Sequence, residues 1–292
     1  MDFDTFMAQA WADHAADAEG VAKRLSEQAV ALLSSESQLV QLMNLNHHVW
    51  GAHLHDAARG SASFDSLMAS AYFVAHGESD SMADRCMASL SLTEFADFSL
   101  AALTPSDQIR VQAMAAANLA DLDAARGMQL LQAALNQVKQ SNLPVADPMN
   151  RAMAVAGHNL AASLEEKSVL SADEIALMLM AAKASRTYWE RAGTWLQVER
   201  AEYQLAATFL KSGDLAQAEF HARECGRIVT ENSAPALEQF FAAVALASVM
   251  RAAKNEAAFN AANHQAQTAF GELADDDRAW CEASLKKLVW TD

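Results

Sequence analysis

Apolar residues recur at helical spacing along most of the chain, and residues 201–225 show this most clearly. That stretch reads AEYQLAATFLKSGDLAQAEFHAREC. Its first part carries one apolar stripe, formed by Ala201, Leu205, Ala206 and Phe209. Side chains three and four residues apart lie on the same face of an α-helix, so this stripe predicts a helix with one buried face.

The stripe breaks at Gly213-Asp214 and then resumes. Glycine readily adopts the left-handed conformation that ends a helix, and aspartate caps the start of the next one. Small side chains at Ala206, Ala218 and Ala222 allow two antiparallel helices to approach closely. The segment therefore predicts a helical hairpin with a tight turn.

The order of residues in this hairpin resembles a tetratricopeptide repeat (TPR). The similarity rests on Leu205-Ala206, Phe209, Gly213-Asp214-Leu215 and the later alanines. It is closest over 195–230, extends to 106–138 and 234–272, and is weak before residue 105. A similar turn precedes interior alanines about 40 residues apart, and in five of seven cases an acid stands two positions earlier. These alanines are Ala22, Ala58, Ala96, Ala125, Ala176, Ala218 and Ala258.

A stack of such hairpins is the fold that this pattern predicts, because each hairpin buries its apolar face only against its neighbours. We expect an all-α protein: a right-handed TPR-like α-α superhelix, or solenoid, of about seven degenerate hairpins. Residues 275–290 are expected to form a C-terminal capping helix that packs through Trp280, Leu285 and Val289. Residues 1–292 would form a single domain, with a hinge at the proline-containing segment 141–149.

Composition agrees with an almost entirely helical chain. The sequence is 52% hydrophobic, with only 10 glycines and 4 prolines in 292 residues, and it has few β-branched residues. The net charge of −16 would repel nucleic acid and anionic membranes. A protein or peptide partner, including a basic one, remains compatible with this charge. Nothing in the sequence indicates whether the chain forms homo-oligomers.

The cysteines and the amino terminus predict a cytoplasmic protein. Cys86, Cys225 and Cys281 are far apart and odd in number, which does not suit a disulfide framework. The opening MDFDTFMAQAW carries acids where a secretion signal has basic residues. No apolar run approaches the length of a membrane span.

The segment LNHHVWGAHLHDAARG, residues 45–60, concentrates four histidines and raises the question of a metal site. Two histidines on one α-helix chelate a metal best when they are four residues apart. None of the separations among His47, His48, His53 and His55 is three or four residues. We therefore predict no metal site, and His48, His53 and His55 are only weak candidates; a bend in the chain could still bring His48 and His53 together.

Catalytic signatures are absent from the sequence. There is no phosphate-binding glycine loop, no dinucleotide motif and no nucleophile elbow. His221 and Cys225 are four residues apart, as a thiolate–imidazole pair requires, but Cys225 falls on a small interior position of the repeat and is expected to be buried and inert. We expect a protein that is not an enzyme and uses no cofactor.

The first helix of each hairpin is expected to line a groove, because ligands of TPR-like stacks lie along those helices. In the C-terminal half these helices are predicted at about 150–165, 194–211 and 236–253. Polar residues off their apolar stripes include side chains able to hold a peptide backbone or carboxylate. The predicted groove residues are Arg151, His158, Asn159, Arg200, Tyr203, Gln204 and Arg251.

Three functions follow from these expectations. The first is a non-catalytic scaffold or adaptor that binds a protein or peptide segment in the groove of the superhelix. The alternative is a regulatory sensor that responds to a small molecule or peptide and acts through another protein. The third is a histidine-rich metal-binding protein or enzyme.

Overall fold

The chain folds into α-helices joined by short connections. The computed structural model describes residues 1–290, and within that range it contains fourteen α-helices and no β-strand. The helices divide into two compact units, Met1–Met149 and a second unit that starts at Asn150. Among residues 1–290, no helix is both long and apolar enough to span a lipid bilayer. The all-α prediction is confirmed.

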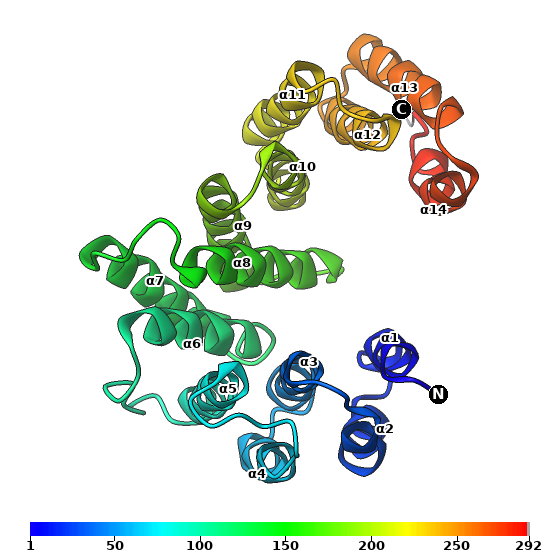
Figure 1. Ribbon diagram of the computed structural model, residues 1–292. Helices are drawn as coiled ribbons and strands as arrows, with labels where there is room; N and C mark the ends of the chain where they lie inside the picture. Colours follow the sequence, from blue (N-terminus) through cyan, green and yellow to red (C-terminus); the bar gives the residue numbers. More distant parts are fainter. Residues whose placement is uncertain (291–292) are drawn as a thin grey trace. The chain divides into compact units, whose positions relative to one another are not determined.

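The first unit contains seven α-helices and three short segments with other helical hydrogen bonding (Figure 1). Its α-helices are α1 (Phe3–Asp13), α2 (Ala18–Arg24), α3 (Glu36–His48), α4 (Ala57–Met68), α5 (Glu78–Glu94), α6 (Pro105–Asn118) and α7 (Ala124–Gln140). The short segments are the π-helical η1 (Leu25–Ala29) and η3 (Val49–His53) and the 3₁₀ turn η2 (Val30–Leu32).

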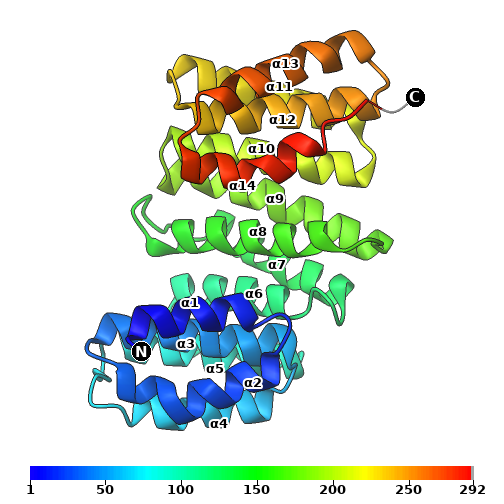
Figure 2. The ribbon, with the colours of Figure 1, turned by 90° about the vertical axis from the view of Figure 1, so that its right-hand side faces the viewer.

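The second unit contains mostly longer helices, and most of them pack mainly on their neighbours in sequence. Its helices are α8 (Pro148–Glu166), α9 (Ala172–Ala192), α10 (Trp195–Ser212), α11 (Leu215–Glu231), α12 (Ala236–Ala252), α13 (Glu256–Gly271) and α14 (Asp275–Lys286). In Figure 1, α10 and α12 form one row of this unit, and α11 and α13 form a second row beside it. Figure 2 shows the same helices from the side, lying lengthwise against one another.

Capping residues explain where several helices begin and end. Gly213 ends α10 in the left-handed conformation, with φ of 86°, and the Asp214 carboxylate accepts a hydrogen bond from the Gln217 amide at the start of α11. Both features match the sequence-based prediction. The string Asp-Ala-Ala-Arg-Gly occurs twice, at residues 56–60 and 123–127, and starts a helix each time. Asp56 caps the amino terminus of α4, and Asp123 caps that of α7.

Small residues set the close packing of α10 on α11. Ala206, Ala218 and Ala222 are all buried, as predicted for a hairpin with closely spaced helices. The fold therefore consists of sequentially packed helical hairpins, which agrees with a helical repeat. The boundary between the two units lies within the first turn of α8, at the end of the segment 141–149; the single domain with a hinge there stays a prediction.

The C-terminal helix α14 packs on α12 and α13, but of the three residues expected to form this contact, Trp280, Leu285 and Val289, only Leu285 is half-buried. Trp280 is 65% exposed and Val289 is 59% exposed, whereas Cys281 and Leu288 are buried. The Trp280 ring still contacts the Phe241 ring, with centroids 5.1 Å apart. Because α14 ends at Lys286, Val289 is not part of the helical face that the prediction assumed.

Candidate functional site

The polar residues predicted on α10 mostly join this helix to its neighbours. Arg200 Nη2 donates to Glu238 Oε1 on α12 at 2.9 Å. The Tyr203 ring packs edge-on against Phe241 of α12, with centroids 5.7 Å apart. These contacts link α10 to α12, and Tyr203 also packs against the apolar cluster between α11 and α12.

Gln204 joins α10 to α8 by two hydrogen bonds. Its Nε2 donates to the backbone carbonyl of His158, and its Oε1 accepts from His158 Nδ1, each at 2.9 Å. Only 4% of Gln204 is exposed, so water cannot hydrogen-bond to its side-chain amide, and these two bonds take the place of those to water. We assign Gln204 a role in holding the helices together.

The remaining predicted groove residues lie at different places in the second unit. The Arg151 guanidinium stands over the Trp189 ring at 5.8 Å, and Asn159 is exposed on α8. Arg251 Nη1 donates to the carbonyls of Lys287 and Val289, and so holds the segment after α14. The seven residues therefore include four that form hydrogen bonds between elements of the fold, namely His158, Arg200, Gln204 and Arg251.

His221 and Cys225 share a face of α11 but bind different glutamates of α10. His221 Nδ1 lies 2.6 Å from Glu202 Oε2, and Arg186 of α9 donates to the other oxygen of Glu202 at 2.5 Å. Burial alone would raise the pKa of Glu202, but the hydrogen bonds from His221 and Arg186 outweigh it and lower that pKa.

The Cys225 thiol donates to Glu199 Oε1 at 2.9 Å in a buried setting. Burial raises the pKa of Cys225, and the nearby Glu199 carboxylate raises it further. A thiol held in its neutral form is a poor nucleophile. The geometry therefore agrees with the buried, inert cysteine predicted from the sequence.

A large hollow of the second unit lies between α11 and α13, with α12 as its floor. Its volume is about 900 Å³. Each helix contributes residues at helical spacing: Ala222, Gly226 and Val229 from α11, Gln239, Ala242, Ala243 and Leu246 from α12, and His264, Gln265, Thr268 and Ala269 from α13. We call this hollow the α11–α13 groove.

Small side chains account for the depth of the α11–α13 groove. The alanines of its floor leave the space that larger residues would fill, and Gly226 stands in the middle of α11 with no side chain. A Cβ atom added at Gly226 would meet no atom within 4 Å. The packing of the fold therefore gives no reason for glycine at this position, where it costs roughly 1 kcal/mol relative to alanine.

Charges of both signs surround the α11–α13 groove. Arg223 and Arg227 lie along α11, while Glu231 and Glu272 stand at the ends of their helices. Arg227 is held by Glu224 at 3.0 Å and by Glu231 at 2.5 Å. The rim can therefore offer both hydrogen-bond donors and acceptors to a bound chain.

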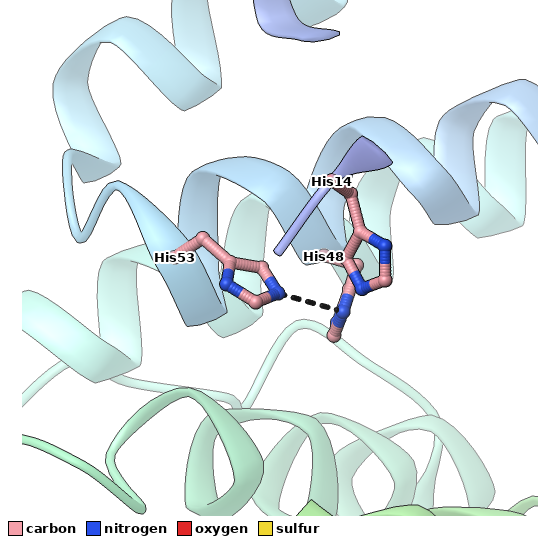
Figure 3. A group of neighbouring side chains, drawn as sticks. All are labelled: His14, His48 and His53. Atoms are coloured by element: carbon pink, nitrogen blue, oxygen red, sulfur yellow. Dashed lines mark hydrogen bonds between the residues drawn. The ribbon is translucent and has the colours of Figure 1, made fainter. Parts of the chain in front are cut away.

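Three histidines meet in the first unit, as Figure 3 shows. They are His14, which follows α1, His48 at the end of α3, and His53 at the end of η3. One ligating nitrogen from each lies within 4.8 Å of the other two. The Nε2 atoms of His48 and His53 are 3.1 Å apart. We call this group the histidine triad.

A π-helical turn explains why spacing alone did not find the triad. His48 and His53 are five residues apart, which places them on different faces of a regular α-helix. The segment Val49–His53 is π-helical, with its hydrogen bonds made between residues five apart, and this wider turn brings the two rings together. His55 turns away and its Nδ1 contacts the carbonyl oxygen of Gly51 at 3.0 Å. His14 was missed because it lies far from the cluster in sequence.

Comparison with protein-family models, with curated proteins and with solved structures finds no match. The resemblance to tetratricopeptide repeats therefore stays a prediction.

Proposed function

We propose that this chain is a non-catalytic scaffold whose second unit binds a peptide segment of a partner protein in the α11–α13 groove. The hairpins would then be degenerate TPR-like repeats of a right-handed superhelix. The observation that carries the proposal is the open space above Gly226, in the middle of an otherwise ordinary helix. A glycine that the fold does not need is explained by close approach of a ligand to the helix backbone.

The location differs from the one expected from the sequence. The first-helix residues Arg200 and Gln204 are engaged with Glu238 and His158, so they support the helix stack more directly than a ligand. The α11–α13 groove instead combines an apolar floor with a polar rim. Peptide-binding grooves commonly have this composition, since the floor gives affinity and the rim fixes direction and register.

The volume and charge of the α11–α13 groove favour a short peptide as ligand over the broad surface of a globular protein. A volume of about 900 Å³ lies near the upper end of the roughly 300–1,000 Å³ found for small-ligand pockets. A few side chains of a peptide would fill it. The local rim is mixed in sign, whereas the net charge of −16 would speed encounters with a basic partner.

The proposal is tested by selecting peptides that bind the purified chain and comparing their affinity for two leucine variants. Gly226→Leu adds a side chain inside the α11–α13 groove. Gly271→Leu is the matched control, because Gly271 also has open space at its Cβ position but lies at the end of α13, outside the groove lining. Far-UV circular dichroism and thermal melting verify that both variants fold.

We expect Gly226→Leu to weaken peptide binding by more than about tenfold, equivalent to about 1.4 kcal/mol, and Gly271→Leu to leave it unchanged. Equal affinity of both variants would refute the groove assignment. If a small molecule and no peptide binds in a Gly226-dependent manner, the sensor function replaces the scaffold function, and the volume of the groove is compatible with that outcome.

A further inference from the structure

We propose that the histidine triad of the first unit binds one divalent transition-metal ion of the zinc class. The site would be formed by His14, His48 and His53. It is independent of the peptide groove, since all three residues belong to the first unit.

The distances fit a metal ion with small adjustments. Zinc binds imidazole nitrogens at about 2.0–2.1 Å, so two such nitrogens at a tetrahedral angle lie about 3.3 Å apart. The 3.1 Å between the Nε2 atoms of His48 and His53 is close to that value. The longest edge of the triad, at most 4.8 Å, would shorten by roughly 1.5 Å on binding.

One ligand is already oriented by a backbone hydrogen bond. His14 Nδ1 lies 2.5 Å from the carbonyl oxygen of Trp11, which can only accept, so Nδ1 is the protonated nitrogen. Its Nε2 then carries the lone pair. Metal-binding histidines typically donate their other ring nitrogen in this way, which fixes both tautomer and ring orientation.

The His53 ring lies edge-on to the His14 and His48 rings, and the His14 and His48 rings are tilted at 51° to each other. The His14 ring centroid lies 4.9 Å from that of His48 and 4.8 Å from that of His53, and the Trp11 ring covers one side at 5.3 Å from His48. The three imidazoles come from three different elements, and the Nε2 atoms of His48 and His53 are each other's hydrogen-bond partners. A shared metal ion would take one nitrogen lone pair from each of the three rings.

The electrostatic setting keeps His48 and His53 neutral, as metal binding requires. Burial, together with the smaller effect of the neighbouring histidines, lowers the pKa of His48 to about 3. Burial also lowers the pKa of His53, while the negative charge of Asp121 acts in the opposite sense. Each neutral ring has one nitrogen lone pair. The Nε2–Nε2 hydrogen bond needs a proton on one of these two nitrogens, so that ring carries its proton on Nδ1 instead when a metal binds. The nearby negative charge of Asp121 favours a cation.

Nitrogen ligands select the kind of ion. Neutral imidazole suits Zn²⁺, Co²⁺, Ni²⁺ and Cu²⁺, whereas Mg²⁺ and Ca²⁺ prefer oxygen ligands. Three protein ligands leave a fourth position of a tetrahedral site for water. Because His14 follows α1 and the other two histidines end α3 and η3, the ion would join the amino-terminal helix to the rest of the unit.

The test is metal titration of the full chain without an affinity tag, after stripping with a chelator. Zn²⁺ binding is measured by calorimetry, and Co²⁺ binding by its visible absorption, which reports coordination geometry. The variants are His14→Ala and His53→Ala. His55→Asn is the matched control, because His55 is a nearby histidine outside the triad, and asparagine tolerates its positive φ of 50°.

We expect one Zn²⁺ per chain for the wild type and for His55→Asn, with affinity lowered by more than about tenfold in each of the other variants. Thermal melting without metal shows whether each variant folds. His14→Asn replaces His14→Ala if the latter melts earlier than the wild type. The proposal is overturned if the wild type binds no Zn²⁺ or Co²⁺, or if either triad variant binds as tightly as the wild type.

Discussion

Replacing Gly226 by alanine should make the protein more stable, and the size of the effect follows from the structure. Gly226 lies inside α11, where glycine costs about 0.8–1.0 kcal/mol relative to alanine. The added methyl group meets no atom within 4 Å, so no clash reduces the gain. We therefore expect Gly226→Ala to raise the free energy of unfolding by about 0.5–1 kcal/mol.

Gly157 provides the comparison, because it is also inside a helix of the second unit but is tightly packed. A Cβ atom at Gly157 would lie 2.6 Å from the backbone oxygen of Ala181 and 2.9 Å from the backbone nitrogen of Ser185. These are main-chain atoms of α9, so α8 and α9 would have to separate. Overpacking costs roughly 1–3 kcal/mol, which exceeds or cancels the gain of about 1 kcal/mol in helix propensity.

Urea unfolding followed by circular dichroism measures both variants against the wild type. We expect Gly226→Ala to be more stable and Gly157→Ala to be equal or less stable, with a difference of about 1–3 kcal/mol between the two. The melting temperature should move by roughly 2–4 °C per kcal/mol for a chain of this size.

Gly226 is expected to affect both the stability of the fold and the affinity for the peptide. If Gly226→Ala is more stable and binds the selected peptide more weakly, the glycine is kept for binding at a cost in stability. A Gly226→Ala variant that is less stable than the wild type would refute the reasoning. So would a Gly157→Ala variant that gains as much stability as Gly226→Ala.

Three further changes test other parts of the fold by urea unfolding. Glu199→Gln should be more stable than the wild type at pH 7, and this difference in stability should shrink as the pH falls. Burial raises the pKa of Glu199 in the folded protein above its ordinary 4.5. The charged carboxylate therefore destabilises the fold fully above the folded pKa and not at all below pH 4.5. A pH-independent difference would contradict this. Gln204→Ala should lower the free energy of unfolding by about 1–3 kcal/mol, because the two hydrogen bonds from the buried Gln204 amide to His158 are lost. An unchanged urea midpoint would argue against the α8–α10 link. Asp123→Ala should lose about 1 kcal/mol through loss of the α7 cap, and unaltered stability would remove that role.

The helices and their boundaries could be predicted where local rules decide them. The apolar stripe at 201–209 and the Gly213-Asp214 turn depend on residues close in sequence, so their outcome was visible without tertiary information. The predicted first helices at 150–165, 194–211 and 236–253 likewise correspond to α8, α10 and α12. Local periodicity and capping were sufficient for these elements.

The candidate sites depended on features that the sequence pattern does not contain. The meeting of His48 and His53 requires a π-helical turn, and a five-residue spacing gives no sign of one. The third histidine, His14, is brought near by packing of distant segments. The residues of α10 were read as ligand contacts because they are polar, but Gln204 is buried between helices. Polarity alone does not distinguish a residue that binds a ligand from one that joins two helices.

The most direct test of the proposed function is site-specific photocrosslinking of a selected peptide. A photoreactive amino acid is placed at Thr268, which is exposed on the wall of the α11–α13 groove, or at Asn159, which is exposed on the face predicted from the sequence. We expect the peptide to crosslink from position 268 and not from position 159. Crosslinking from position 159 alone would contradict binding in the α11–α13 groove.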